Sequence, residues 1–272
     1  MRSPPSHVRR RGKAPYHLVV VHGGPGAPGS LAPVADVLAR TAGVLEPWQT
    51  AQSVNGQVEE LANQIERWAT PPVTLIGHSW GAWLSILLAG QRPDLVRRLV
   101  LVGSGPFRAR DALRIEARRK ARLSRTEWSE FQRIGRRFSN PHARVPAAMM
   151  RRFGRLSERS DSFDLRPHRS AGPPPEPATF RKVWPEAEAM RNRGQLRRAV
   201  GRIRAPVLVL HGRDDPHPVE GVVDPLRRSG VKIRVVILDR CGHYPWWEHH
   251  ARDAFFRALR AEVRRSGASS SR

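Results

Sequence analysis

One five-residue motif, Gly77-His78-Ser79-Trp80-Gly81, constrains this chain more than any other feature. It ends the short apolar run 73–76, and an apolar helical pattern begins directly after it. In this strand–turn–helix context, a serine between two glycines stands exposed at the end of a strand, where the small neighbours permit a strained turn. The new helix also aims free N–H groups and the positive end of its dipole at that serine. The pattern predicts that Ser79 is a nucleophile; the alternative is a serine that only caps the helix.

A second glycine-rich turn, His22-Gly23-Gly24-Pro25-Gly26, follows the predicted strand 17–21. Such a turn lets the backbone approach a ligand closely. We expect it to form an oxyanion hole, in which the N–H of Gly24 is one donor and the N–H of Trp80, next to the nucleophile, is the other. His22 is expected to support this turn through hydrogen bonds rather than to take part in catalysis.

Two further strand ends carry an acid and a base. The strand 206–210 is followed by Asp214 and Asp215, and the strand 232–238 is followed by a glycine-flanked loop that contains His243. A serine hydroxyl becomes a good nucleophile only when a base takes its proton, and histidine titrates near neutral pH. We therefore predict Asp215 as the residue that orients the imidazole of His243, with Asp214 as the alternative acid.

The other C-terminal histidines, His211, His217, His249 and His250, are interpreted as surface or loop residues. Cys241, the single cysteine, lies near the predicted base but has no strand–turn–helix context of its own, so a core or loop role is expected. No spacing of histidine, cysteine and carboxylate indicates a metal site, and the chemistry needs no cofactor.

The periodicity divides the chain into a core with an inserted helical segment. Helices are expected over 31–40, 55–69 with Asn55 as the cap, 219–228 and 248–263, with a further strand at 43–47. The alternation of strands and helices stops after Gly105, where the inserted segment begins. This segment is rich in arginine and proline and shows helical patterns over 111–123, 126–138, 145–156 and 180–200. The predicted organisation is a flexible basic tail (1–15), a first core part (16–105), a helical cap (106–202), a second core part (203–265) and a disordered tail (266–272).

Charge and cysteine content limit the remaining function classes. Of 272 residues, 48 are Lys or Arg and 24 are Asp or Glu, a formal net charge of +24. This excess could mark a surface for a polyanion, but the arginines are spread over the whole chain and no nucleic-acid-binding motif is present, so a nucleic-acid partner is not expected. One cysteine excludes an internal disulfide and fits a reducing, cytoplasmic location. The first apolar run, 18–21, is too short for a signal peptide or a membrane span, so no membrane partner is expected.

Four segments together resemble the α/β-hydrolase superfamily and, within it, the proline iminopeptidase-like branch: HGGPG at 22–26, GHSWG at 77–81, HGRDDPHP at 211–218 and CGHYPWWE at 241–248. The resemblance implies a mostly parallel sheet of about six strands flanked by helices, the triad Ser79, Asp215 and His243, and the oxyanion donors Gly24 and Trp80. Members of the branch begin with an antiparallel strand hairpin that this chain lacks room for. We therefore expect the sheet to be two strands short, with the strand 43–47 at its edge.

The predicted function is a serine hydrolase that cleaves a small amide or ester, or a short peptide, through an acyl-enzyme. Proline iminopeptidases grip the substrate amino group with cap glutamates; here Glu186 and Glu188 are candidates only by position. The aminopeptidase and carboxylesterase alternatives both stay open. A hypothesis from another class is a non-catalytic protein that uses its basic surface to bind polyanions.

Overall fold

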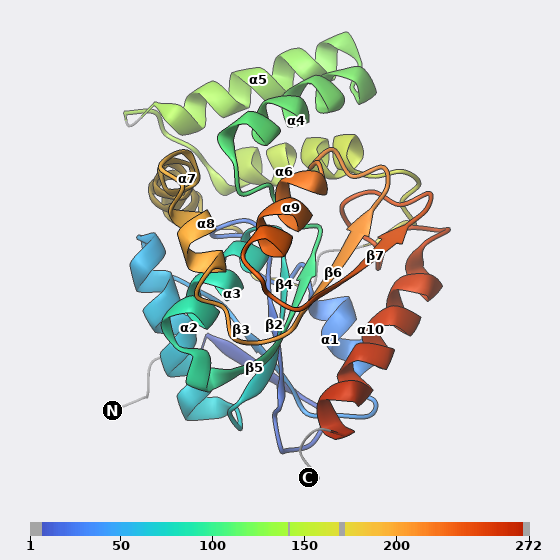
Figure 1. Ribbon diagram of the computed structural model, residues 1–272. Coiled ribbons are helices and arrows are strands. Elements are labelled where there is room, and N and C mark those ends of the chain that lie inside the picture. The colour runs from blue at the N-terminus through green and yellow to red at the C-terminus, as the bar shows by residue number, and fades with distance from the viewer. Residues whose placement is uncertain (1–6, 141, 169–171, 269–272) are drawn as a thin grey trace.

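The computed structural model describes residues 7–140, 142–168 and 172–268, and its centre is a seven-stranded sheet with helices on both faces (Figure 1). The strand order is β1-β3-β2-β4-β5-β6-β7, and every neighbouring pair is parallel except β1 and β3. The strands are β1 (Val8–Arg11), β2 (Leu18–Val21), β3 (Val44–Pro47), β4 (Val73–His78), β5 (Val96–Val102), β6 (Val207–Gly212) and β7 (Ile233–Leu238).

The expectation of a flexible tail over 1–15 is wrong for β1, which pairs antiparallel with β3 and covers the edge at which β3 was expected to lie. Arginine stems stabilise this strand: Arg9 lies over the ring of Trp48, and Arg11 forms an ion pair with the buried Glu46. The sheet therefore has seven strands rather than about six. The expectation missed β1 because three successive arginines give no apolar alternation from which a strand can be recognised.

The central strands are apolar along their whole length because helices cover both faces of the sheet. On one face, α2 (Val54–Trp68), α3 (Trp80–Gln91) and α9 (Glu220–Arg228) pack in one core with alternate strand residues such as Val19 and Leu75. On the other face, α1 (Ala32–Leu38) and α10 (Arg252–Ala268) pack against the intervening residues. The start of α2 and the end of α10 differ from expectation. Ser53, not Asn55, caps α2, and α10 runs through 266–268, where disorder was expected. Residues 269–272 lie outside the described residues, as do 1–6 of the predicted tail.

Within the described residues, five helices follow one another between β5 and β6. They are α4 (Ala109–Arg122), α5 (Arg125–Ser139), α6 (Ala147–Asp161), α7 (Pro177–Asn192) and α8 (Gln195–Val200). Of these, α4, α5 and α6 lie above the end of the sheet where β6 and β7 terminate (Figure 1). The single helix expected over 180–200 is two helices, broken at Gly194, whose φ of 70° suits glycine. Aromatic side chains of α5, α6 and α7 form a small core of their own beside the main one. No described helix is long and apolar enough to cross a membrane.

Candidate active site

Ser79 occupies the turn between β4 and α3 with a backbone φ of 53° and ψ of −113°, a conformation that L-residues rarely adopt. Its N–H donates to the carbonyl of Val102 on β5 at 3.0 Å, which fixes the turn to the sheet. The two glycines of the motif are required because backbone carbonyl oxygens lie too close to the position that a Cβ atom would take. A Cβ atom on Gly81 would lie 2.2 Å from the carbonyl oxygen of Val21, and one on Gly77 would lie 2.3 Å from that of Gly81. The local sequence thus holds a strained serine at the end of a strand.

Asp215 and His243 meet where β6 and β7 end. The Nδ1 atom of His243 lies 2.7 Å from Oδ2 of Asp215, and both residues are buried. The His243 backbone N–H donates to the carbonyl of Asp161 at 2.7 Å, and its own carbonyl accepts a hydrogen bond from the Nε2 of His78 at 3.0 Å. Asp214 points elsewhere and accepts from the N–H of Cys241 at 3.2 Å. Of the two adjacent aspartates, Asp215 is therefore the one that contacts the imidazole.

The Asp215 carboxylate is held in its charged form. Burial alone would raise its pKa, but nearby His243, His217 and His211, together with a side-chain hydrogen bond from His217, hold that pKa well below its usual value. An ionised carboxylate can only accept hydrogen bonds, so the Nδ1 atom of His243 carries the proton. The Nε2 atom of a neutral His243 is then free to take a proton from another group.

A cavity of about 1320 Å³ lies between the sheet end and the helices α4–α7, and Ser79, His243, Gly24 and Trp80 all line it. The hydroxyl of Ser79 forms no hydrogen bond with any side chain in the described ranges. The structure thus brings Asp215 and His243 into contact and places Ser79 and His243 on the wall of one cavity. A serine nucleophile and its base must share a cavity in this way, and the hydrogen bond between them often forms only when substrate is bound.

The two residues expected to supply oxyanion donors, Gly24 and Trp80, line the same cavity as Ser79. Trp80 begins α3, so its backbone N–H has no partner inside the helix. Gly24 has a φ of 68°. The backbone of Gly23 lies so close to the His78 ring that a Cβ atom on Gly23 would be 2.6 Å from Nδ1 of His78. His22 is buried beneath this turn with Nδ1 3.2 Å from the Gly23 carbonyl, and burial lowers its pKa to about 4. A neutral, enclosed His22 fits a supporting role.

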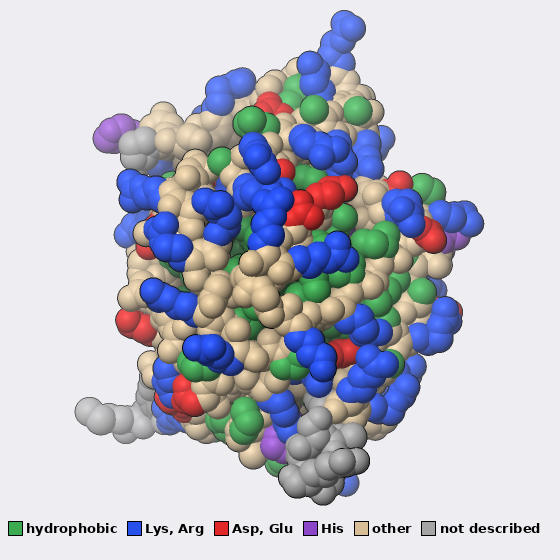
Figure 2. All heavy atoms as spheres, viewed as in Figure 1, with side chains coloured by type: hydrophobic (Ala, Val, Ile, Leu, Met, Phe, Trp, Pro, Cys, Tyr) green, Lys and Arg blue, Asp and Glu red, His purple; other side chains and the backbone are tan. Residues whose placement is uncertain are grey.

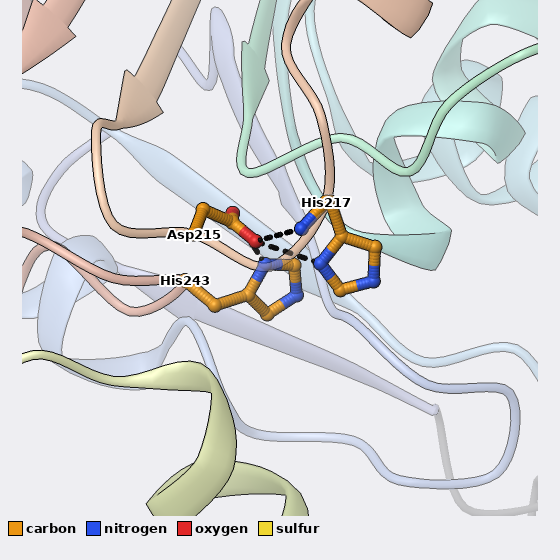
Figure 3. Close-up of side chains that lie close together, drawn as sticks. All are labelled: Asp215, His217 and His243. Atoms are coloured by element: carbon orange, nitrogen blue, oxygen red, sulfur yellow. Dashed lines mark hydrogen bonds and ion pairs between the residues drawn. The ribbon is translucent and has the colours of Figure 1, made fainter. Parts of the chain in front are cut away.

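The interpretation of His211 as a surface or loop residue is wrong, because His211 lies in β6 and is buried against Asp215. His217 is a loop residue, as expected, but it is buried against Asp215 rather than placed on the surface (Figure 3). Nδ1 of His217 lies 2.7 Å from Oδ1 of Asp215, and Nε2 of His211 donates to the His217 carbonyl at 2.8 Å. His249 and His250 are exposed, as expected. The prolines at 216 and 218 force a tight turn after the acid; this turn was the signal that could have predicted the inward position of His217.

Asp215, His217 and His243 also form the one set of donor atoms within the described ranges that is compact enough to hold a metal ion. The Nδ1 atoms of both imidazoles are already used against the two carboxylate oxygens, each at 2.7 Å. This spacing is that of hydrogen bonds, and it is shorter than the roughly 3.3–3.6 Å that separates two tetrahedral ligands bound to one zinc ion at about 2.0–2.2 Å. The donor set therefore fits a hydrogen-bonded group better than a metal centre.

Two residues that sequence reasoning missed hold the His243 loop against the cap. Glu248 is fully buried, and its carboxylate accepts from the backbone N–H groups of Gly242, Phe163 and Asp164 at 2.7–2.8 Å. Asp161 offers its carbonyl to His243, while its side chain forms two hydrogen bonds with Arg119 of α4. Burial alone would raise the pKa of Asp161, but Arg119 holds it below its usual value. The position of His243 thus depends on the end of α6 and on the segment that follows it.

The cavity wall is largely aromatic and its outer part is basic. Trp83 and Trp184 stack with ring centroids 6.1 Å apart, and Trp184 continues the stack with Phe180 at 6.0 Å. The cavity-lining arginines Arg136, Arg151 and Arg155 of α5 and α6 are exposed. Figure 2 shows basic side chains scattered over the visible face of the molecule rather than gathered on one element.

Two other sequence candidates have ordinary structural roles. The Glu186 side chain accepts from the Val54 N–H at 2.8 Å, at the start of α2, and Glu188 lines the cavity but pairs with Arg191 at 3.2 Å. Cys241 is buried, and burial raises the pKa of its thiol, so it stays protonated and unreactive.

A sheet of this order with a serine turn, an acid and a base at three strand ends defines an α/β hydrolase fold. A sequence model of the alpha/beta hydrolase family matches residues 18–258, and the chain belongs to that family. It is 29% identical over 180 residues to the pimeloyl-[acyl-carrier protein] methyl ester esterase of Nitrosomonas europaea, covering 64% of this chain and just under two thirds, 65%, of that protein. Identity to the protein of that name in Klebsiella pneumoniae is 28% over 219 residues, or 77% of each chain.

Solved structures show the same fold at lower sequence identity. The proline iminopeptidase of Mycobacterium smegmatis superposes with a TM-score of 0.64 and 17% identity, covering 97% of this chain and 96% of that one. At this identity the likeness concerns the fold, and it leaves the substrate undecided.

Proposed function

We propose that this protein is a serine hydrolase that cleaves carboxylic esters, with Ser79 as nucleophile, His243 as general base and Asp215 as the acid that orients it. The observation that carries the proposal is the shared cavity wall. A strained serine at the end of β4 and an imidazole hydrogen-bonded to a buried carboxylate both line it. The names of the two curated relatives, both methyl ester esterases, support the ester class.

The chemistry follows from the protonation states. The lone pair on Nε2 of His243 takes the hydroxyl proton as Ser79 Oγ bonds to the ester carbonyl carbon. The N–H groups of Gly24 and Trp80 stabilise the resulting oxyanion; in other enzymes the loss of one such donor costs about 3–4 kcal/mol. The carbon–oxygen bond to the alcohol then breaks, and His243 returns its proton to the departing alkoxide. Water activated by His243 releases the acid from the acyl-enzyme and restores the Ser79 hydroxyl.

The charges around the cavity favour an ester over a peptide amino terminus. The two glutamates that were candidates for holding a substrate ammonium group are engaged elsewhere, because Glu186 is bound to backbone and Glu188 is paired with Arg191. Glu116 of α4 also lines the cavity and has no ion pair among the described residues, so it is the one carboxylate that speaks for the aminopeptidase alternative. The exposed Arg136, Arg151 and Arg155 would repel a cation but attract an anion. Aromatic walls and a volume of about 1320 Å³ suit an acyl chain. We therefore propose acyl methyl esters as substrates, either free or attached to an acidic carrier protein.

The test combines covalent labelling with a substrate series. Wild-type protein and the Ser79→Ala variant are treated with a fluorophosphonate probe and assayed on p-nitrophenyl esters of increasing chain length, on acyl methyl esters and on amino-acid amides. Ser229→Ala, which changes a serine of the α9 end that does not line the cavity, is the matched control. We expect labelling and ester turnover in the wild type and the control, and a loss of at least about a thousandfold in kcat for Ser79→Ala.

Three outcomes would contradict the proposal. Turnover in Ser79→Ala equal to that of the wild type would show that Ser79 is not the nucleophile. Preferred hydrolysis of amino-acid amides would favour the aminopeptidase alternative. If no labelling occurs and nucleic acid binds with an affinity that falls steeply with salt, the protein is a polyanion-binding member of the fold instead.

A further inference from the structure

The Asp215 carboxylate contacts two imidazoles, one on each oxygen (Figure 3). His243 takes Oδ2, while His217 approaches Oδ1 with its ring Nδ1 at 2.7 Å and also donates its backbone N–H to that oxygen at 2.9 Å. The proposed mechanism uses only the first of these imidazoles. His217 lines the same cavity as His243, and its ring stacks on the His243 ring with centroids 4.4 Å apart and planes tilted by 26°.

The hydrogen-bond chemistry fixes the protonation of both rings. An ionised carboxylate accepts only, so His217 and His243 each carry a proton on Nδ1 when neutral. Burial lowers the pKa of His217, and so favours its neutral form, although Asp215 partly opposes this. A neutral His217 is a hydrogen-bond donor to the triad acid that adds no positive charge next to His243.

Three other titratable side chains face this pair. From β4, His78 packs on the His243 ring with centroids 4.7 Å apart, and burial lowers its pKa well below the usual value. From β6, His211 lies 3.6 Å from Oδ2 of Asp215 but donates to the His217 carbonyl. Tyr244 meets the His243 ring edge-on, and burial raises its pKa well above the usual value.

From the cap, α4 contributes a buried ion pair and two backbone contacts. Arg119 is paired with Asp161, so this pair adds little net charge near the imidazoles. Arg118 donates to the carbonyls of Asp215 and Pro216 at 3.1 and 3.3 Å and holds the turn that carries His217. Among all these groups, His217 is the side chain that shares the carboxylate with the base.

We propose that His217 is a positioning residue that shares the Asp215 carboxylate with His243 and lowers the basicity of His243. The inference rests on the proposed function of the site. A carboxylate favours the protonated form of a neighbouring imidazole, and a second donor on that carboxylate stabilises its charge and weakens this effect. His243 therefore stays unprotonated, and able to accept the Ser79 proton, at a lower pH than it would with Asp215 to itself.

Two variants separate this role from simple packing. His217→Leu keeps apolar bulk but removes the ring donor, whereas His217→Asn places an amide N–H close to the position of Nδ1. The probe is p-nitrophenyl acetate, and the readout is the acid limb of kcat/KM against pH, which reports the pKa of the base in the free enzyme. We expect the midpoint of this limb to rise by about one pH unit in His217→Leu and to stay within about 0.3 unit in His217→Asn.

Packing damage would lower kcat/KM at every pH and leave the midpoint in place. An unmoved limb in His217→Leu, or an equal shift in both variants, therefore overturns the proposal. If the leucine variant does not fold, proton NMR of the wild-type protein decides the question. Two downfield imidazole N–H signals are expected, one lost in His217→Asn and the other in His243→Asn; a single such signal overturns the proposal.

The outcome is separable from the proposed function. Without fluorophosphonate labelling of Ser79 the hydrolase proposal fails, while the NMR measurement still tests the shared carboxylate. With labelling and turnover present, an unmoved acid limb refutes only the role of His217.

Discussion

Glu248 provides a sharp test of how the cap positions His243, the proposed general base. Its carboxylate joins the loop of His243, through the N–H of Gly242, to residues 163 and 164 beyond α6. The same two segments are also joined by backbone hydrogen bonds, including Arg166 N–H to the carbonyl of Trp247 at 2.8 Å. The substitution Glu248→Gln keeps the size of the side chain but replaces one acceptor oxygen by a donor NH₂ group.

The expected loss in the free energy of unfolding follows from the three hydrogen bonds that the Glu248 carboxylate accepts. One backbone N–H loses its acceptor and faces another donor, at a cost of about 1–3 kcal/mol. The other two bonds lose their charge assistance, at about 0.5–1 kcal/mol each. Because the bonds to residues 163 and 164 are only partly buried, we take the lower part of the range, about 2–4 kcal/mol in total. At about 2 °C per kcal/mol for a chain of this size, Tm should fall by about 4–8 °C.

The assay is thermal unfolding of Glu248→Gln beside Glu220→Gln, an exposed glutamate whose change alters the net charge equally. Ester turnover is measured on both variants below their melting temperatures. We expect the control to match the wild type within about 0.5 kcal/mol, and Glu248→Gln also to lose kcat because the loop that carries His243 is loosened. Melting within about 1 °C of the control would refute the reasoning that this carboxylate joins the two segments.

Three further predictions concern the same site. Gly103→Ala would put a Cβ 3.0 Å from Nδ1 of His243 at a φ of 51°, so kcat/KM should fall at least about tenfold in the ester assay, and unchanged kinetics would contradict this. Arg119→Met would leave buried Asp161 unpaired and cost about 3–5 kcal/mol in urea unfolding. Because the pKa of Asp161 is depressed in the fold, its pairing stabilises the protein above the unfolded pKa of about 3.9 and is lost as pH falls below it. Tm of the wild type should thus fall below about pH 4 more steeply than that of the variant, and parallel curves would speak against the pair. Trp184→Ala should raise KM for long acyl esters more than for acetate, and an equal change would exclude this ring from the acyl site.

The parts of the site that could be predicted are those encoded within a few residues. The turn around Ser79 depends on glycines two positions away on either side, so five letters specify it. Asp215 was separable from Asp214 only by resemblance, since both follow the same strand. The side chain of His217 was misplaced because two prolines decide which way the turn after Asp215 points, and this direction is not visible in periodicity.

The missed elements depend on partners far along the chain. β1 has three arginines in a row, and it is a strand only because Trp48 and Glu46 lie where the arginine stems can pack and pair. The contact of Glu248 with residues 163 and 164 joins segments 84–85 residues apart, and no local sequence pattern predicts it.

The sequence alone carried the residues of the proposed chemistry: a serine in a glycine turn, an aspartate and a histidine, each after an apolar strand, together with the order in which they occur. The positions of the central strands and of the core helices along the chain followed from apolar periodicity, which is a property of neighbours in the chain. Only the tertiary structure decided that one carboxylate serves two imidazoles, and that the base loop rests on the cap through Glu248 and Asp161. Those pairings depend on where distant segments come to lie once both faces of the sheet are buried.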